Sequence, residues 1–172
     1  QTLIDALNGA IGIQAACYGT MSNLTFGDSK FGYYETICGG EGASSNSNGC
    51  DAVHCHMTNT SITDAEILEW FYPVRLISFS IRKNSGGIGK WVGGNGVIRE
   101  IEFLKNLEVT ILSNRRIINP FGIKGGKDGK VGENIIVKNH KKIILGSSCR
   151  ISVKNGDLIK IKTPGGGGYG KV

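Results

Sequence analysis

Glycine is the feature that most constrains how this chain can fold. The sequence has 27 glycines among 172 residues but only 3 prolines. This is more than twice the average glycine share of about 7%, yet the glycines follow no Gly-X-Y period, which excludes a collagen-like triple helix. The scarcity of proline excludes Pro-rich disorder. We therefore expect a folded chain in which many backbone positions leave no room for a side chain.

A period of two dominates the C-terminal half of the sequence. In residues 74–83, Ile77, Phe79 and Ile81 alternate with polar residues, as expected of a strand with one buried face. Asn155-Gly156 is typical of a two-residue hairpin turn. The predicted fold class is mainly β (α+β), with antiparallel strands, Gly-rich turns and one or two short helices. Further strands are predicted at Val97–Phe103, Val109–Leu112, Asn134–Val137, Lys142–Leu145, Arg150–Val153 and Leu158–Ile161.

Two segments favour helices. Residues 1–7 have the character of a helix that is already under way, without a capping residue before it. Thr63 and Glu66 have the spacing of a capping box, and Pro73 limits the helix that follows to a short one. Because the chain opens on Gln within a helical pattern, we expect residues 1–172 to be a single C-terminal segment of a longer subunit.

Composition excludes several classes of protein. No apolar run approaches the ~18 residues of a membrane span, and the first ten residues lack the pattern of a signal peptide, so we expect a cytoplasmic protein without a membrane partner. The net charge is +6, but the basic residues are scattered and no recognition motif accompanies them, which argues against nucleic acid as a partner. Five cysteines without a C-x-x-C pair predict free thiols in a reducing compartment.

The Gly-rich segments have competing interpretations. Residues 165–171 satisfy the G-x-x-x-x-G-K pattern of a phosphate-binding loop, but Val172 follows where a Ser or Thr is required. We interpret this run as a closely packed tail, with the approach of a ligand or another chain as the alternative. Gly39–Gly49 is interpreted as a mobile surface loop, and Asp51–Asn59 as a strand that follows it.

One polar run, residues 56–60, carries the best candidates for chemistry. His56 is the candidate general acid or base, and Thr58 and Asn59 could contact a substrate carbonyl or carboxylate. The alternative is that these side chains satisfy backbone groups at a turn. His54 and His56 would share one face of a strand, but a metal site needs a third ligand, so we assign no metal to this chain.

Two further pairs are candidate site residues. Tyr33 and Glu35 offer a phenol and a carboxylate for acid–base work, and a simple ion pair between Glu35 and an arginine is the alternative. Arg115 and Arg116 could hold an anion through bidentate hydrogen bonds. Because adjacent residues on a strand face opposite sides, we expect at most one of these arginines to point into a given site.

Taken in order, these segments resemble the hydantoinase B/oxoprolinase family, which includes the C-terminal part of 5-oxoprolinase, the B-type component of N-methylhydantoinase and a related component of acetone carboxylase. No single motif is specific, but the ordered series covers nearly the whole chain. The matching stretches are Tyr18–Gly27, Tyr33–Thr36, His56–Thr60, Tyr72–Arg75, Gly86–Gly89, Gly93–Gly96, Arg115-Arg116, Pro120–Gly122 and Thr163–Gly170.

The resemblance implies an ATP-dependent amidohydrolase that opens a cyclic amide. A hydantoinase A-type subunit or domain would bind ATP with Mg and activate the carbonyl as a phosphorylated intermediate. The missing N-terminal part of the B-type subunit would carry any divalent metal, and the assembly would be an oligomer. In this scheme the catalytic residues would be His56, Glu35 and Tyr33, and the substrate-binding residues Thr58, Asn59, Arg115 and Arg116.

Two departures from the family pattern favour an alternative of another class. The metal-binding region of the family is absent from this sequence, and Asn114 stands where members commonly have Asp before the paired arginines. The alternative is a non-catalytic structural or assembly fragment of a split or decaying gene.

Overall fold

A computed structural model describes residues 2–56, 58 and 60–172. Strands dominate this part of the chain and the two helices are short, which confirms the predicted fold class. The elements in chain order are α1 (Thr2–Ile11), β1 (Asn23–Gly27), β2 (Gly32–Thr36), α2 (Ala65–Phe71), β3 (Val74–Ile81), β4 (Val97–Phe103), β5 (Leu107–Leu112), β6 (Glu133–Lys138), β7 (Lys141–Leu145), β8 (Ser148–Val153) and β9 (Leu158–Lys162).

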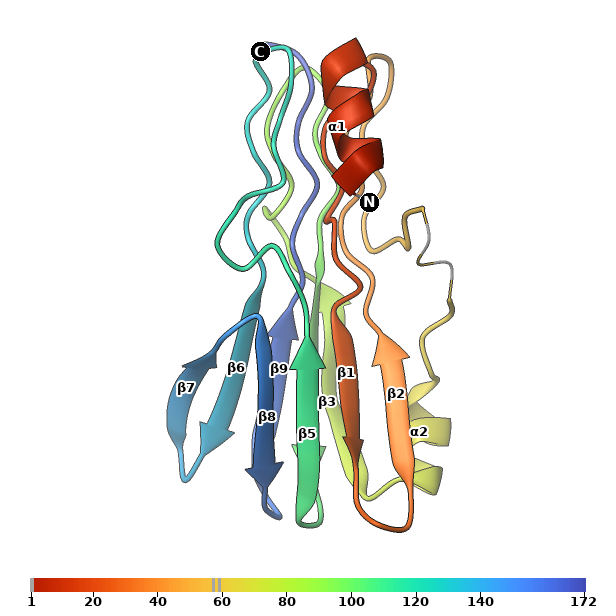
Figure 1. Ribbon diagram of the computed structural model, residues 1–172, viewed down its shortest axis with the longest axis vertical. Coiled ribbons are helices and arrows are strands. Elements are labelled where there is room, and N and C mark those ends of the chain that lie inside the picture. Colours follow the sequence, from red (N-terminus) through yellow and green to blue (C-terminus); the bar gives the residue numbers. More distant parts are fainter. Residues whose placement is uncertain (1, 57, 59) are drawn as a thin grey trace.

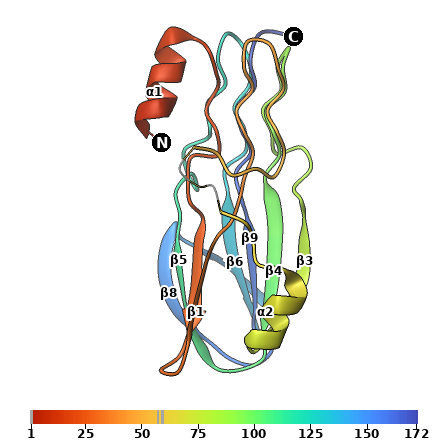
Figure 2. The ribbon, with the colours of Figure 1, turned by 90° about the vertical axis from the view of Figure 1, so that its right-hand side faces the viewer.

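The strands form two sheets that lie face to face. One sheet has the order β2-β1-β5-β8 and the other the order β3-β4-β9-β6-β7, and every pairing between neighbours is antiparallel. Figures 1 and 2 show these two layers in the lower half of the molecule. The fold of this half is therefore a β-sandwich.

Alternating side chains fill the space between the two sheets. In β4 and β5 every second residue is buried, as the period of two requires. Leu24, Phe26, Ile101, Phe103 and Ile111 are among the apolar side chains with an exposed fraction of 1% or less. Each such side chain stabilises the fold by about 1.5–3 kcal/mol through its removal from water.

Among the described residues, the segments in the upper half of the molecule form no regular strands, although they are extended and lie side by side (Figures 1 and 2). We call residues 14–18, 39–43, 85–94, 120–130 and 163–170 the glycine bundle. Its segment 163–170 is central, because the amides of Gly166, Gly167 and Gly168 donate to three different neighbouring segments. The acceptors are the carbonyl oxygens of Gly94, Ala16 and Lys127, at 2.9, 2.8 and 2.9 Å respectively.

Close approach of backbones explains the glycines of this bundle. A Cβ atom on Gly166 would overlap the carbonyl oxygen of Glu41, and one on Gly167 would overlap that of Phe121. Only glycine fits such positions, as at the crowded axis of collagen. The interpretation of residues 165–168 as a packed tail is confirmed. The prediction of a mobile surface loop at Gly39–Gly49 is wrong for its first half, because Gly39, Gly40, Gly42 and Ala43 are buried in the bundle.

The N-terminal half contains two departures from the sequence analysis. The strand expected at Asp51–Asn59 is absent from its described residues, where Val53 makes an isolated bridge with Gly39. Ala52 and His56 have φ values of 52° and 57°, which no strand accommodates. The hairpin formed by β1 and β2 was not predicted, because each strand is only five residues long.

The helices and one turn also refine the predictions. Both helices are confirmed, but α2 is capped by Asp64 rather than Thr63, since the Asp64 carboxylate accepts from the amides of Glu66 and Ile67. Asn155-Gly156 does form a tight turn. The predicted hairpin is wrong, because β8 and β9 belong to different sheets and the turn carries the chain from one to the other.

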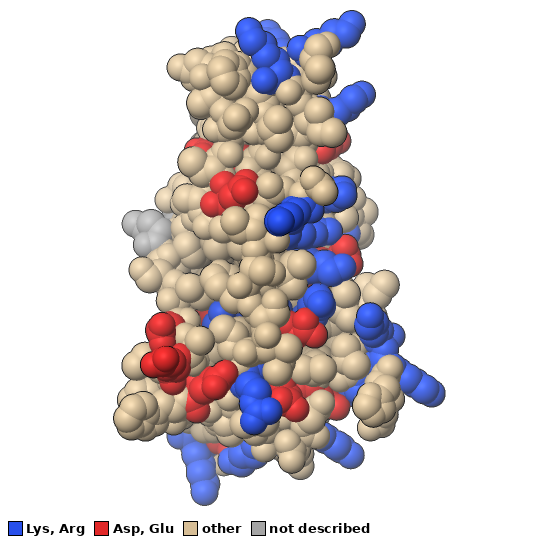
Figure 3. All heavy atoms as spheres, turned by 180° about the vertical axis from the view of Figure 1, so that it is seen from behind, with Lys and Arg blue, Asp and Glu red and all other residues tan. Residues whose placement is uncertain are grey.

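The surface charge follows no single pattern. On the face shown in Figure 3, acidic and basic side chains are interspersed over both halves of the molecule. Neither α1 nor α2, the helices of the described residues, is long and apolar enough to cross a bilayer.

Candidate functional site

Two adjoining pockets lie where the β-sandwich meets the glycine bundle. Because β1, β5 and β8 are antiparallel neighbours, the start of β1, the end of β5 and the start of β8 share one edge of the sheet. The segments that continue from this edge, residues 18–22 and 113–116, line both pockets together with α1. The topology therefore brings together residues that are far apart in the sequence.

The first pocket, which we call the hydroxyl pocket, has a volume of about 300 Å³. The Thr58 hydroxyl donates to the carbonyl oxygen of Cys55 at 2.8 Å, so its oxygen accepts from the Tyr18 hydroxyl at 2.5 Å. Burial raises the pKa of Tyr18 to about 12, which keeps the phenol protonated and able to donate. The lining residues are Thr2, Tyr18, Gly19, Thr20, Met21, Cys55, Thr58 and Asn114.

The second pocket, which we call the arginine pocket, has a volume of about 410 Å³ and shares Thr2, Gly19 and Asn114 with the first. Its cationic groups are Arg115 and Arg116. Its lining residues are Thr2, Asp5, Gly19, Asn114, Arg115, Arg116, Ile117, Ile118 and Ser147.

Arg115 and Arg116 both line this pocket, so the expectation that at most one arginine would reach a given site is wrong. The two residues follow the end of β5 and do not lie on a strand. Arg115 has a φ of 53°, which breaks the alternation that an extended strand would impose. Gly19 leaves the space for its guanidinium, because a Cβ there would lie 2.9 Å from Arg115 Nε.

The charge of Arg115 is balanced within the pocket. Its Nη2 lies 3.0 Å from the carboxylate of Asp5, a buried residue of α1, and its Nη1 donates to the carbonyl oxygen of Asn119. The backbone carbonyl of Asn114 accepts from Arg116, and its amide side chain carries no charge to pair with either arginine. Asp5 thus supplies the ion-pair partner that Asn114 does not.

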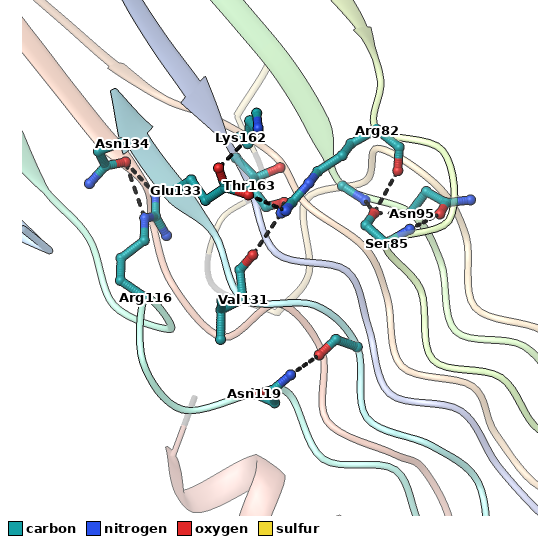
Figure 4. Close-up of polar contacts among 12 residues, drawn as sticks. Arg82, Ser85, Asn95, Arg116, Asn119, Val131, Glu133, Asn134, Lys162 and Thr163 are labelled. Carbon is teal, nitrogen blue, oxygen red and sulfur yellow. Dashed lines mark hydrogen bonds and ion pairs between the residues drawn. The ribbon is translucent and has the colours of Figure 1, made fainter. Parts of the chain in front are cut away.

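Arg116 belongs to a cluster in which cations outnumber carboxylates (Figure 4). Its guanidinium donates to the Asn134 side-chain oxygen and to the Asn114 carbonyl oxygen, which are neutral acceptors. Glu133 is shared by Arg82 and Lys162, at 2.8 and 2.9 Å. Burial and the nearby Arg82 lower the pKa of Arg116 to about 10. This part of the pocket wall therefore favours an anion.

The residues of the polar run after Cys55 lie in different environments. Thr58 is buried and lines the hydroxyl pocket, as a substrate contact requires. His56 is exposed and has a left-handed backbone, and it is two residues from Thr58 in the same segment. Asn59 lies outside the described residues. The structure places Thr58 in the wall of the hydroxyl pocket and Arg115 and Arg116 in the wall of the adjoining arginine pocket, whereas His56 lines neither.

Tyr33 and Glu35 lie in the interior of the β-sandwich. The Glu35 carboxylate makes a bidentate ion pair with Arg99 of β4, at 2.7 and 3.0 Å, and the Tyr33 hydroxyl donates to it at 2.8 Å. The side chains of Arg99 and Glu35 are 1% and 4% exposed, so the pair is closed to solvent. The alternative interpretation of Glu35, an ion pair with an arginine, is confirmed, and the pair joins the two sheets.

Several residues of the cavity were not singled out as site residues by the sequence analysis. Tyr18 and Thr20 lie in a stretch quoted for the family resemblance, and Thr20 accepts from the amide of Asn114 at 2.8 Å. Asp5 and Asn134 carried no motif at all. Over the described residues, no group of three or more His, Cys, Asp or Glu side chains could hold a metal ion.

Comparisons with known proteins agree on one family. The family model described as hydantoinase B/oxoprolinase matches residues 1–172. A 5-oxoprolinase from Dictyostelium discoideum is 52% identical over 172 residues, which are 99% of this chain and 14% of that protein. The chain therefore spans about one seventh of the length of this relative.

Two solved structures have the same fold. An ATP-dependent caprolactamase from Pseudomonas jessenii superimposes with a TM-score of 0.81 and 25% identity, over 96% of this chain and 32% of that chain. An acetone carboxylase in its nucleotide-free form gives a TM-score of 0.73 at 18% identity, over 91% of this chain and 26% of the other. At that identity the second comparison shows the fold alone.

Proposed function

This chain belongs to the hydantoinase B/oxoprolinase family, and we propose that it is the C-terminal segment of an ATP-dependent hydrolase that opens a cyclic amide, of the 5-oxoprolinase or hydantoinase type. The observation that carries the proposal is the pair of adjoining pockets, one lined by Tyr18 and Thr58 and the other by Arg115 and Arg116, which share Thr2, Gly19 and Asn114. The names of the relatives support it, since one is a 5-oxoprolinase and another an ATP-dependent caprolactamase.

The hydroxyl pocket would bind the amide group. Tyr18 and Thr58 are aligned by the hydrogen bond from Thr58 to the Cys55 carbonyl, so their positions are set before a substrate arrives. Because the Tyr18 hydroxyl donates its proton to Thr58, its oxygen would accept a hydrogen bond from the amide N–H of the substrate. Arg115 and Arg116 would orient an anionic group of the reacting molecule.

Proton transfer is assigned to His56. Its segment is anchored by Thr58, whose amide and hydroxyl both bond to the Cys55 carbonyl, while the His56 side chain remains exposed. In this proposal Glu35 and Tyr33 act indirectly. Their buried contact with Arg99 holds β2 against β4.

ATP and any metal are assigned to the rest of the assembly. Gly165–Gly168 are buried in the glycine bundle against neighbouring backbone, and the described residues contain no group of three or more His, Cys, Asp or Glu side chains that could hold a metal ion. We propose that a hydantoinase A-type subunit or domain binds ATP with Mg, that the N-terminal part of the B-type subunit completes the site, and that the enzyme is a cytoplasmic oligomer. ATP supplies the activation of the amide carbonyl.

The decisive test uses the complete polypeptide that contains this chain, assembled with its ATP-binding partner. We expect ATP-dependent ring opening of 5-oxoproline or a hydantoin, and a loss of roughly 10²–10⁴-fold in kcat for His56→Ala, the range typical of a general acid or base. His140→Ala is the matched control, because His140 is also exposed with a positive φ but lies in the β6–β7 turn. Full activity of folded His56→Ala would remove His56 from the mechanism.

Inactivity of the assembled enzyme towards cyclic amides would favour the alternative, a non-catalytic assembly fragment.

A further inference from the structure

Two of the five cysteines meet beside the hydroxyl pocket. Cys17 and Cys55 come from different segments, are 1% and 8% exposed, and pack together with Tyr18. The neighbouring thiol is the largest cause of the shift in the pKa of each of the two cysteines. Cys50 is exposed and Cys149 is half-buried, which makes these two suitable internal controls.

Backbone hydrogen bonds fix the positions of the two segments that carry Cys17 and Cys55. The amide of Tyr18 donates to Gly40, and Val53 and Gly39 donate to each other, so the segments that carry Cys17 and Cys55 are both fastened to residues 39–40. The Gly42 amide donates to the Cys17 sulfur at 3.4 Å. Backbone hydrogen bonds therefore hold the two cysteines in one packed cluster.

The pKa values of the two thiols shift in opposite directions. The Cys55 thiol and the Gly42 amide donate to Cys17 and lower its pKa, whereas contact with Cys17 and burial raise the pKa of Cys55. The thiolate is the nucleophilic form of cysteine, so the lowered pKa favours attack by Cys17, and a neighbouring thiol can resolve its oxidised form.

We propose that Cys17 and Cys55 are a reversible dithiol–disulfide pair beside the hydroxyl pocket, oxidised by a small peroxide. The cavity of about 300 Å³, which Cys55 lines, admits a molecule of this size. The Cys17 sulfur attacks one peroxide oxygen, so that an S–O bond forms, the O–O bond breaks and the departing oxygen leaves as water. The Cys55 sulfur then displaces the sulfenic oxygen as a second water and forms the S–S bond. Two thiols and one peroxide give one disulfide and two waters.

The disulfide would reshape the pocket. An S–S bond is about 2.05 Å long, so the two sulfurs must approach each other from hydrogen-bond contact. Cys17 directly precedes Tyr18, and the Cys55 carbonyl accepts from Thr58, so both ends of the Tyr18–Thr58 hydrogen bond are attached to the pair. An effect on catalysis rests on the proposed function, whereas formation of the disulfide does not.

The test is to treat the full chain with hydrogen peroxide, alkylate the remaining thiols and map the cysteine peptides by mass spectrometry. We expect the loss of two of the five free thiols and a linked peptide pair containing Cys17 and Cys55, reversed by dithiothreitol. In Cys149→Ser the same link forms, and in Cys55→Ser it is lost while Cys17 proceeds to irreversible oxidation. Cys17→Ser and Cys55→Ala repeat the test should Cys55→Ser fail to fold.

Cys17 and Cys55 still reduced at a peroxide concentration that oxidises Cys50 would overturn the proposal, as would a link from Cys17 to any other cysteine. In the complete enzyme, we expect peroxide to lower activity and dithiothreitol to restore it. A disulfide that forms in an assembly without amide hydrolysis would leave the pair established and refute the proposed function alone.

Discussion

The two halves of this molecule hold themselves together in different ways. In the β-sandwich, side chains such as Phe26, Ile101 and Phe103 fill the space between two sheets, and the backbones stay apart. In the glycine bundle, backbones touch each other at Gly166 and Gly167, and no side chain separates them. The comparison shows that one half of the molecule is packed by side chains and the other by direct contact between backbones at glycine positions.

The difference also predicts how each half responds to substitution. A sandwich core tolerates exchanges among apolar side chains of similar volume, usually at less than about 1.5 kcal/mol. A backbone contact has no such freedom, because a single added carbon meets a carbonyl oxygen that is fixed by its neighbours. A single added carbon in the bundle should therefore be more damaging than an exchange of similar apolar side chains in the sandwich.

The largest effect is expected from Gly166→Ala. Its Cβ would overlap the Glu41 carbonyl oxygen, and the central segment cannot move without losing hydrogen bonds to its neighbours. We expect a cost of more than about 3 kcal/mol, at or beyond the usual range for overpacking, measured as the free energy of unfolding in urea. Gly32→Ala is the matched control, since a Cβ at Gly32 meets no atom within 4 Å. Equal stability of the two variants would refute the account of the bundle.

Within the sandwich, the largest polar effect is expected from Glu35→Gln. The substitution leaves the Arg99 guanidinium buried without its carboxylate, which typically costs about 3–5 kcal/mol. Glu108→Gln is the control, because Glu108 pairs with Arg150 on the exposed face of the sheet, where such pairs contribute about 0–1 kcal/mol. Thermal unfolding of both variants measures the difference, and similar Tm values would contradict a structural role for the Glu35–Arg99 pair.

The smallest effect concerns pH at the junction of the two halves. Lys162 and Arg82 hold the pKa of Glu133 below its ordinary value of 4.5. The ionised form therefore stabilises the fold above that value, and this contribution is lost as the pH falls through the lowered pKa. We expect Glu133→Gln to lose less stability than the unmodified chain between pH 7 and pH 3, measured by thermal unfolding across that range. An unchanged acid profile of Glu133→Gln would argue against the ion-pair cluster.

The sandwich was largely predictable from the sequence, because alternation reports directly on a strand with one buried face. Residues 97–103 show this clearly, with burial at every second position. A cluster of glycines indicates only that side chains are absent, and both a closely packed segment and a mobile loop have this pattern. Gly39–Gly49 could therefore be interpreted as a mobile loop. Nor does a turn such as Asn155-Gly156 indicate whether its two strands share a sheet, since that depends on contacts distant in sequence.

The candidate site was predictable in part. Thr58, Arg115 and Arg116 were identified from polar and paired-arginine patterns and lie in the cavity. Glu35 has the same local appearance as a catalytic carboxylate, and only the position of Arg99 on the facing sheet shows its partner. Asp5 and Tyr18 reach the cavity through the antiparallel order of β1, β5 and β8, which no local pattern contains.

The position of a bound cyclic amide tests the account most directly. A structure of the complete enzyme with 5-oxoproline or a hydantoin should show the amide group beside the hydroxyls of Tyr18 and Thr58, with Arg115 and Arg116 at the other end of the molecule. A substrate bound elsewhere, with this cavity occupied by solvent or by another part of the polypeptide, would contradict the account.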